Sequence, residues 1–169
     1  NLGDISQRCR ETLEAADFIA AEDTRVSLKL LNHLGIKKSL VSYYEHNKAF
    51  KGDKIVERIL AGETCALVSD AGSPAISDPG EDLVALCAER GITVTSIPGC
   101  CAGITALTLS GLPTRRFTFE GFLSVNKAER KKHLDSLKNE PRTMIFHEAP
   151  HKLKTTLSDL RDAFGDTRR

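Results

Sequence analysis

Apolar and polar residues alternate along this chain in blocks whose lengths match those of short strands and helices. Apolar runs predict strands at residues 18–21, 40–44, 65–68, 92–97, 117–122 and 143–146. Apolar residues at helical spacing predict helices near residues 5–16, 28–34, 55–60, 83–87, 104–109, 126–138 and 153–160. Regular alternation of this kind is typical of an α/β fold, so we expect a mostly parallel sheet with helices on both faces.

Capping residues support two of these helices. Asp4 precedes the first helical stripe and is expected to be its N-cap, and Gly35 follows the second stripe as a C-cap. Residues of these types satisfy the backbone groups that a helix end leaves without a partner.

Polar clusters follow four of the predicted strands, at residues 22–25, 45–47, 69–80 and 98–102. The carboxyl ends of parallel strands meet at one edge of a sheet, where open α/β proteins bind their ligands. The sequence therefore predicts a binding site at this edge.

The loop at residues 69–80 is the strongest candidate for part of that site. Gly72 removes a side chain where a ligand could approach the backbone, and Pro74 stiffens the chain beside it. Asp70 adds a carboxylate at the strand end. An ordinary connection between a strand and a helix would explain the same residues.

Two of the other clusters carry groups that could transfer protons or bind a ligand. The first of them contains Glu22, Asp23 and Arg25, which could supply a base or a magnesium ligand. Alternatively, the acids could simply be stabilised there by the N-terminus of the following helix. His46, between Glu45 and Asn47, is a proton-transfer candidate or a solvated loop histidine.

The fourth cluster and one helix offer weaker signals. The small residues of 98–103 could form a backbone cradle or allow close helix packing, and we expect the thiols of Cys100 and Cys101 to pack. The basic run 127–133 could be a solvated helix face or, with Arg115 and Arg116, a phosphate-contacting patch.

Composition narrows these alternatives only slightly. The chain has 169 residues and a net charge of +1, so global charge argues for neither nucleic acid nor a membrane. Five cysteines without a C-x-x-C pair favour a reducing cytoplasm. The sequence has no dinucleotide-binding fingerprint and no phosphate-binding P-loop. The letters of a zinc motif at 147–151 include Pro150, which a continuous helix would not accommodate, so we expect no metal site.

Seven sequence blocks occur in order along the chain: NLGDI at 1–5, EDTR at 22–25, EHN at 45–47, SDAGSPAISDPG at 69–80, PGCCAGITAL at 98–107, FEGFL at 119–123 and PRTMIFHEAPHKL at 141–153. Together they resemble the tetrapyrrole-methylase superfamily, and most closely its bacterial ribosomal branch, the 16S rRNA (cytidine-2′-O)-methyltransferases. Two positions depart from the pattern, since Ser73 stands where Thr is usual and Cys100 where Pro is usual.

The resemblance implies a two-domain, cytoplasmic, commonly homodimeric enzyme that uses S-adenosylmethionine to 2′-O-methylate a cytidine of 16S rRNA in the 30S subunit, with no membrane association. Residues 1–169 would be its N-terminal α/β domain, with a first strand and a C-terminal domain absent. The residues expected to bind the cofactor are Asp70, Ala71, Gly72, Ser73, Pro74, Pro98, Gly99, Cys100, Cys101, Ala102 and Phe122. Those expected to contact RNA are Asn47, Arg115, Lys127, Arg130 and Lys131.

Methyl transfer from a sulfonium is an in-line displacement, so positioning supplies much of the rate. A ribose 2′-hydroxyl is a poor acid, so a base or desolvating partner is also needed. The candidate catalytic residues are Glu22, Asp23, Arg25 and His46, with Glu148 a further candidate base, and the sequence does not choose among them. Other readings are a methyltransferase of tetrapyrroles or other small molecules, a non-catalytic domain that kept the fold, and a magnesium-dependent phosphoryl-transfer enzyme using Asp70 and Asp23.

Overall fold

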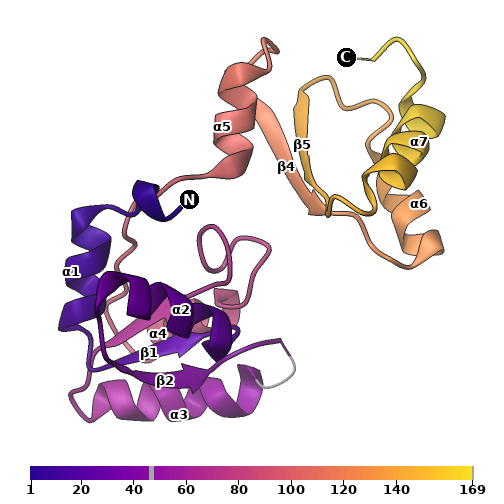
Figure 1. Ribbon diagram of the computed structural model, residues 1–169. Helices are drawn as coiled ribbons and strands as arrows, with labels where there is room; N and C mark the ends of the chain where they lie inside the picture. The colour runs from indigo at the N-terminus through magenta and orange to yellow at the C-terminus, as the bar shows by residue number, and fades with distance from the viewer. Residues whose placement is uncertain (46–47, 169) are drawn as a thin grey trace. The chain divides into compact units, whose positions relative to one another are not determined.

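The computed structural model describes residues 1–45 and 48–168, and the chain divides into two compact units, Asn1–Cys101 and Ala102–Arg169 (Figure 1). Each unit has its own parallel sheet. Among the described residues, no helix combines the length and apolar character needed to cross a bilayer.

The first unit contains a three-stranded parallel sheet in the order β2-β1-β3. Its elements are the 3₁₀ helix η1 (Leu2–Asp4), α1 (Gln7–Ala15), β1 (Phe18–Ala21), α2 (Thr24–Leu34), β2 (Ser39–Ser42), α3 (Lys48–Leu60), β3 (Cys65–Val68) and α4 (Glu81–Glu89). Ile19 of the central strand β1 lies opposite Leu40 on one side and Ala66 on the other. The carboxyl ends of all three strands therefore reach the same edge.

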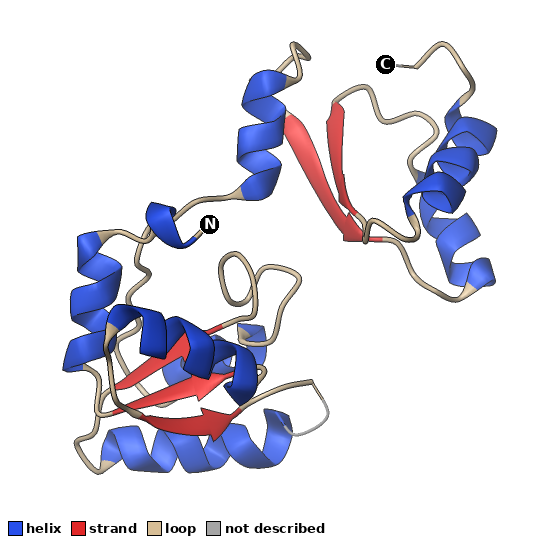
Figure 2. Cartoon of the chain, in the orientation of Figure 1, coloured by secondary structure: helices blue, strands red, loops and turns tan. Residues whose placement is uncertain are grey.

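Helices cover both faces of this sheet, as the alternation of elements predicts (Figure 2). Phe18 and Ala20 of β1 point to one face and pack with Ile55 of α3 and Leu83 of α4. Ile19 points to the opposite face, where its cluster includes Leu13 of α1, Leu31 of α2 and Ile36. All four β1 residues are fully buried, which fixes β1 as the centre of the unit.

The N-cap of the N-terminal helix lies two residues later than predicted. Ser6 is the N-cap of α1, and its hydroxyl accepts a hydrogen bond from the backbone N–H of Cys9 at 3.1 Å. Asp4 belongs instead to η1, so its prediction as the cap is wrong. Gly35 does end α2 in the left-handed conformation, with φ of 72°, as predicted.

Residues 92–97, all described, form no strand, and the strand prediction there is wrong. A strand needs a neighbour with which to exchange backbone hydrogen bonds, and alternating apolar residues do not provide one. In the described part of the chain, β3 pairs only with β1. Val94 is consequently 49% exposed.

The second unit pairs β4 with β5 in parallel and packs helices beside them. Its elements are α5 (Ala102–Leu109), β4 (Phe117–Phe122), α6 (Lys127–Ser136), β5 (Thr143–His147) and α7 (Leu153–Phe164). The β4–β5 register shifts between Phe119 and Gly121, which has φ of 62°. At Gly103 of α5, an added Cβ would lie 3.3 Å from Ile145 Cγ2, so the absence of a side chain lets α5 approach β5 closely.

Candidate functional site

Two loops at the carboxyl edge of the first sheet are tied together by reciprocal hydrogen bonds. The backbone N–H of Asp23, just after β1, donates to Asp70 Oδ1 at 3.2 Å. In return, the backbone N–H of Asp70, just after β3, donates to Glu22 Oε2 at 3.4 Å. The structure thus brings together the 22–25 and 69–80 clusters, as parallel strands predict.

Asp23 is committed to local structure. It is the N-cap of α2, where its Oδ1 accepts from the backbone N–H of Arg25 at 2.8 Å. The Arg25 guanidinium also holds both carboxylate oxygens, with Nη2–Oδ2 at 2.6 Å, and this pairing lowers the pKa of Asp23 to about 2. The Arg25 side chain is still 87% exposed, so the loop presents a cation to solvent.

Glu22 differs from Asp23 in its electrostatic surroundings. Burial raises the pKa of its carboxyl above the ordinary value, the hydrogen bond from Asp70 opposes this, and the negative charges of Asp70 and Asp78 add to the rise. Glu22 is therefore a more basic carboxylate than an ordinary glutamate, at the edge where the sequence predicts a ligand.

The backbone of the 69–80 loop takes several conformations that side chains disfavour. Gly72 and Gly80 have φ of 76° and 141°, and the non-glycine residues Ala75 and Ser77 have φ of 65° and 59°. A Cβ at Gly80 would lie 2.7 Å from Leu67 Cδ2, so a side chain there would clash with the strand residue. Backbone strain of this kind concentrates at ligand-binding loops.

The turn at residues 98–101 is open rather than packed. Pro98, Gly99, Cys100 and Cys101 are all exposed, and an added Cβ at Gly99 would meet nothing within 4 Å. Our expectation that the two thiols pack is wrong, because the segment before them forms no strand that would carry them under a helix. Cys100 Sγ lies 3.8 Å from the Asp4 carbonyl oxygen, a weak contact.

The remaining predicted cofactor residues, Ala102 and Phe122, belong to the second unit. Phe122 at the end of β4 is 55% exposed, and its ring meets the His147 ring edge-on with centroids 5.5 Å apart. Phe119 makes a similar contact to His147 at 5.1 Å. Ala102 begins α5 and is exposed.

His147 is the first residue of the zinc-motif letters, and it lies in the 146–148 strand end that the family resemblance also implies as a contributor to the methyl-donor pocket. Its Nε2 is buried and has no hydrogen-bond partner among the described residues, and it lies 3.4 Å from the Cβ position at Gly103. β5 ends at His147, and His151 lies in the turn before α7, so the two histidines do not share a helix, as Pro150 predicts.

Arg130, predicted to contact RNA, is engaged inside the second unit. Its Nε donates to Asp159 Oδ2 at 2.6 Å and its Nη2 to Thr156 Oγ1 at 2.7 Å, and its side chain is only 15% exposed. Thr156 is 3% exposed and donates in turn to Glu148 Oε2 at 2.6 Å. Hydrogen bonds from Thr156 and from the Ala149 N–H lower the pKa of Glu148, which makes it a poor base.

Other predicted RNA contacts lie on the surface. Arg115, Lys127 and Lys131 are all exposed, the last two on α6. The predicted residues His46 and Asn47 lie outside the described residues.

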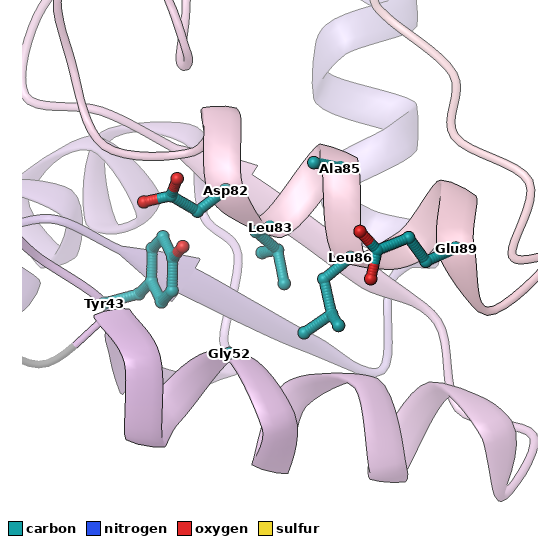
Figure 3. Close-up of a pocket in the computed structure, with 7 residues that line it drawn as sticks. All are labelled: Tyr43, Gly52, Asp82, Leu83, Ala85, Leu86 and Glu89. Atoms are coloured by element: carbon teal, nitrogen blue, oxygen red, sulfur yellow. The ribbon is translucent and has the colours of Figure 1, made fainter.

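A groove lies between α3 and α4 (Figure 3). Its volume is about 300 Å³, and its lining residues are Tyr43, Gly52, Asp82, Leu83, Ala85, Leu86 and Glu89. Gly52 lines the groove without a side chain, and a Cβ there would make an ordinary contact with Leu86 Cδ2 at 3.7 Å. The groove includes no residue that the sequence predicts to be functional.

The chain belongs to the family of tetrapyrrole (corrin/porphyrin) methylases, which it matches over residues 1–169. It is 48% identical over 169 residues to ribosomal RNA small subunit methyltransferase I of Pseudomonas aeruginosa, covering 100% of this chain and 60% of the relative. The proteins of the same name from Synechocystis sp. and Halalkalibacterium halodurans are 51% and 52% identical, over 99% and 95% of this chain. The chain thus spans 55–60% of the length of these relatives.

Solved structures with much lower identity share the fold. A diphthine synthase matches with a TM-score of 0.64 at 16% identity, covering 94% of this chain and 67% of that protein. A cobalt precorrin-4 methyltransferase from cobalamin biosynthesis matches with a TM-score of 0.65 at 15% identity, covering 96% and 70%.

Proposed function

We propose that the protein carrying this chain is an S-adenosylmethionine-dependent methyltransferase that 2′-O-methylates a cytidine of 16S rRNA in the 30S subunit. The observation that carries the proposal is identity of 46–52% to proteins named ribosomal RNA small subunit methyltransferase I, over 95–100% of this chain. In this proposal residues 1–169 are the N-terminal domain of a two-domain enzyme, which acts in the cytoplasm as a homodimer.

The residues predicted to hold the cofactor have the character that such a ligand needs. Ala71, Gly72 and Ser73 are exposed beside Asp70, and an added Cβ at Gly72 would meet nothing within 4 Å, so a ligand can reach the backbone. Carbonyl groups and small side chains can hold a sulfonium without strong attraction, which matters because its charge disappears during transfer. When bound, S-adenosylmethionine supplies an electrophilic methyl group. In the proposal the cofactor contacts are Asp70, Ala71, Gly72, Ser73, Pro74, Pro98, Gly99, Cys100, Cys101, Ala102 and Phe122.

Exposed cations support a nucleic-acid substrate. Lys127 and Lys131, four residues apart, share one face of α6, Arg115 precedes β4, and Arg25 extends from the candidate site. In the proposal these side chains contact phosphates, while Arg130 supports α6 from within through Asp159.

A second candidate is a methyltransferase of tetrapyrroles or another small molecule, favoured by the family match and by the fold shared with a cobalt precorrin-4 methyltransferase. Transfer of tritium from labelled S-adenosylmethionine by the full-length protein separates the two candidates. We expect label in 30S subunits and none in a panel of tetrapyrroles; label in a tetrapyrrole alone would contradict the rRNA proposal.

A further inference from the structure

We propose that Glu22 accepts the proton of the hydroxyl group that receives the methyl group. This role rests on the proposed function, and it assigns a step that the sequence leaves open among several residues.

Glu22 has the right position for a ligand at the carboxyl edge of the sheet. It follows the last residue of the central strand β1, and its backbone N–H donates to the Val68 carbonyl oxygen of β3 at 3.4 Å. This contact, together with the one from the Asp70 N–H to its side chain, fixes Glu22 between two strand ends. A proton acceptor needs such fixed placement, because transfer requires hydrogen-bond distance to the substrate hydroxyl.

The two other described carboxylates among the candidate bases, Asp23 and Glu148, are occupied. Asp23 caps α2 and is held by both oxygens to Arg25, so accepting a proton would break strong charge-assisted hydrogen bonds. Glu148 accepts short hydrogen bonds from Thr156 at 2.6 Å and from the Ala149 N–H at 2.7 Å. Within the described residues, the Glu22 carboxylate accepts one long hydrogen bond, on one oxygen, which leaves lone pairs available.

The charges around Glu22 favour proton uptake. The carboxylates of Asp70 and Asp78 from the loop after β3, and Asp23 from its own loop, disfavour a further negative charge on Glu22, and burial raises its pKa in the same direction. Arg25 is the cation beside this cluster, and its closest bonds are to Asp23. Burial, first, and the neighbouring carboxylates therefore make Glu22 more basic than an ordinary glutamate.

The O–H bond of the ribose 2′-hydroxyl breaks as a new O–H bond forms on Glu22, and the electron pair of the broken bond stays on the 2′ oxygen. That oxygen uses the pair to bond the methyl carbon, whose bond to sulfur breaks and leaves its electron pair on the departing S-adenosylhomocysteine. Glu22 then returns its proton to water, which restores the carboxylate.

The test compares Glu22→Gln and Glu22→Asp with wild type in the full-length protein, using single-turnover methyl transfer to 30S subunits. Glu14→Gln is the matched control, because Glu14 is an exposed acid that pairs with Arg10 on α1. We expect the Glu22→Gln rate to fall by about 10²–10⁴-fold, the usual contribution of a positioned base. The shorter Glu22→Asp, which keeps a carboxylate, should recover part of that loss, and Glu14→Gln should match wild type.

Three further measurements separate this role from a structural one. Affinity for S-adenosylhomocysteine by calorimetry and the melting temperature should be unchanged in Glu22→Gln. The wild-type rate should rise with pH through an ionisation above that of an ordinary glutamate, and Glu22→Gln should lack this ionisation. Carbon-13 NMR of the carboxyl groups should show one group that titrates at that pH in wild type and is missing in the variant.

The outcomes are distinguishable. A Glu22→Gln rate within about threefold of wild type, far less than the contribution expected of a base, would overturn the role of Glu22 while leaving the proposed function standing. Parallel losses of cofactor affinity and rate would also overturn it, because they indicate a binding role. Failure of the wild-type protein to methylate 30S subunits would contradict the proposed function itself and this role with it.

Discussion

The backbone N–H of Asp23 donates to the Asp70 carboxylate at 3.2 Å, and this contact joins the loop after β1 to the loop after β3. The two residues are 47 positions apart in sequence, yet parallel pairing of their strands places both at one edge. Asp70 thus has a structural task in addition to any contact with a ligand, and that task can be measured.

Replacing Asp70 with alanine should loosen the Asp23 loop, because the amide of Asp23 loses its acceptor. We expect faster hydrogen exchange at the Asp23 amide and weaker binding of S-adenosylhomocysteine, by roughly tenfold, in keeping with a charge-assisted hydrogen bond of about 1.5–3 kcal/mol. Asp70→Asn, which keeps a carbonyl oxygen, is the matched control. Its exchange rate at Asp23 and its affinity for S-adenosylhomocysteine should lie between those of wild type and Asp70→Ala. Equal exchange at Asp23 in all three proteins would contradict the contact.

Gly80 should tolerate substitution worse than other glycines with positive φ. Gly80→Ala brings a Cβ to 2.7 Å from Leu67 Cδ2, whereas Gly91→Ala at φ of 67° meets nothing within 4 Å. Urea unfolding should show a loss of about 1–2 kcal/mol for Gly91→Ala, from the left-handed backbone alone, and a larger loss for Gly80→Ala. Equal losses of unfolding free energy in the two variants would show that the Leu67 side chain moves aside without destabilising the fold.

Arg130 and Lys131 should separate stability from RNA binding. Arg130→Met leaves Asp159 and the buried Thr156–Glu148 pair without their cation, so we expect a loss of about 3 kcal/mol in the free energy of unfolding. Lys131→Met, on an exposed position of the same helix, should change stability by less than about 0.5 kcal/mol. In a salt titration of RNA binding, Lys131→Met should reduce the slope by about 1, as expected for one lost phosphate contact. A stability loss in Lys131→Met and none in Arg130→Met would contradict the buried role of Arg130.

Glu140 should make stability depend on acid. Two hydrogen bonds of 2.6 Å from the Arg142 guanidinium lower its pKa from 4.5 to about 2. Because the folded pKa is depressed, the stabilisation is present above the ordinary pKa and is lost as pH falls from 4.5 towards 2. Denaturant unfolding across this range should show a shallower pH dependence for Glu140→Gln than for wild type. Asp162→Asn, which alters an exposed pair at 3.6 Å, is the control and should follow wild type.

Local patterns predicted most of the fold because most elements are bounded by local signals. β1 and β3 have the predicted bounds, since each is an apolar run that stops at an acidic or small polar residue. Residues 92–97 carry an equally good strand pattern but form no strand, because pairing depends on a neighbour that the pattern does not specify. Sequence periodicity therefore predicts what a segment can form, and pairing decides whether it does.

The candidate site was predictable as a place but not in its detail. The meeting of Glu22, Asp23 and Asp70 follows from parallel strands, whose carboxyl ends converge whatever the side chains. The sequence does not predict that Arg130 points into the second unit, because its partner Asp159 is 29 residues away on α7. The difference between Glu22 and Asp23 also depends on which carboxylate Arg25 holds.

The most direct test of the account is the identity of the nucleoside that receives the methyl group. Full-length protein, 30S subunits and tritiated S-adenosylmethionine are incubated, the 16S rRNA is digested to nucleosides, and the labelled product is identified by chromatography and mass spectrometry. The account predicts a single labelled product, 2′-O-methylcytidine. Label on a base, on another ribose or on no part of the rRNA would contradict it.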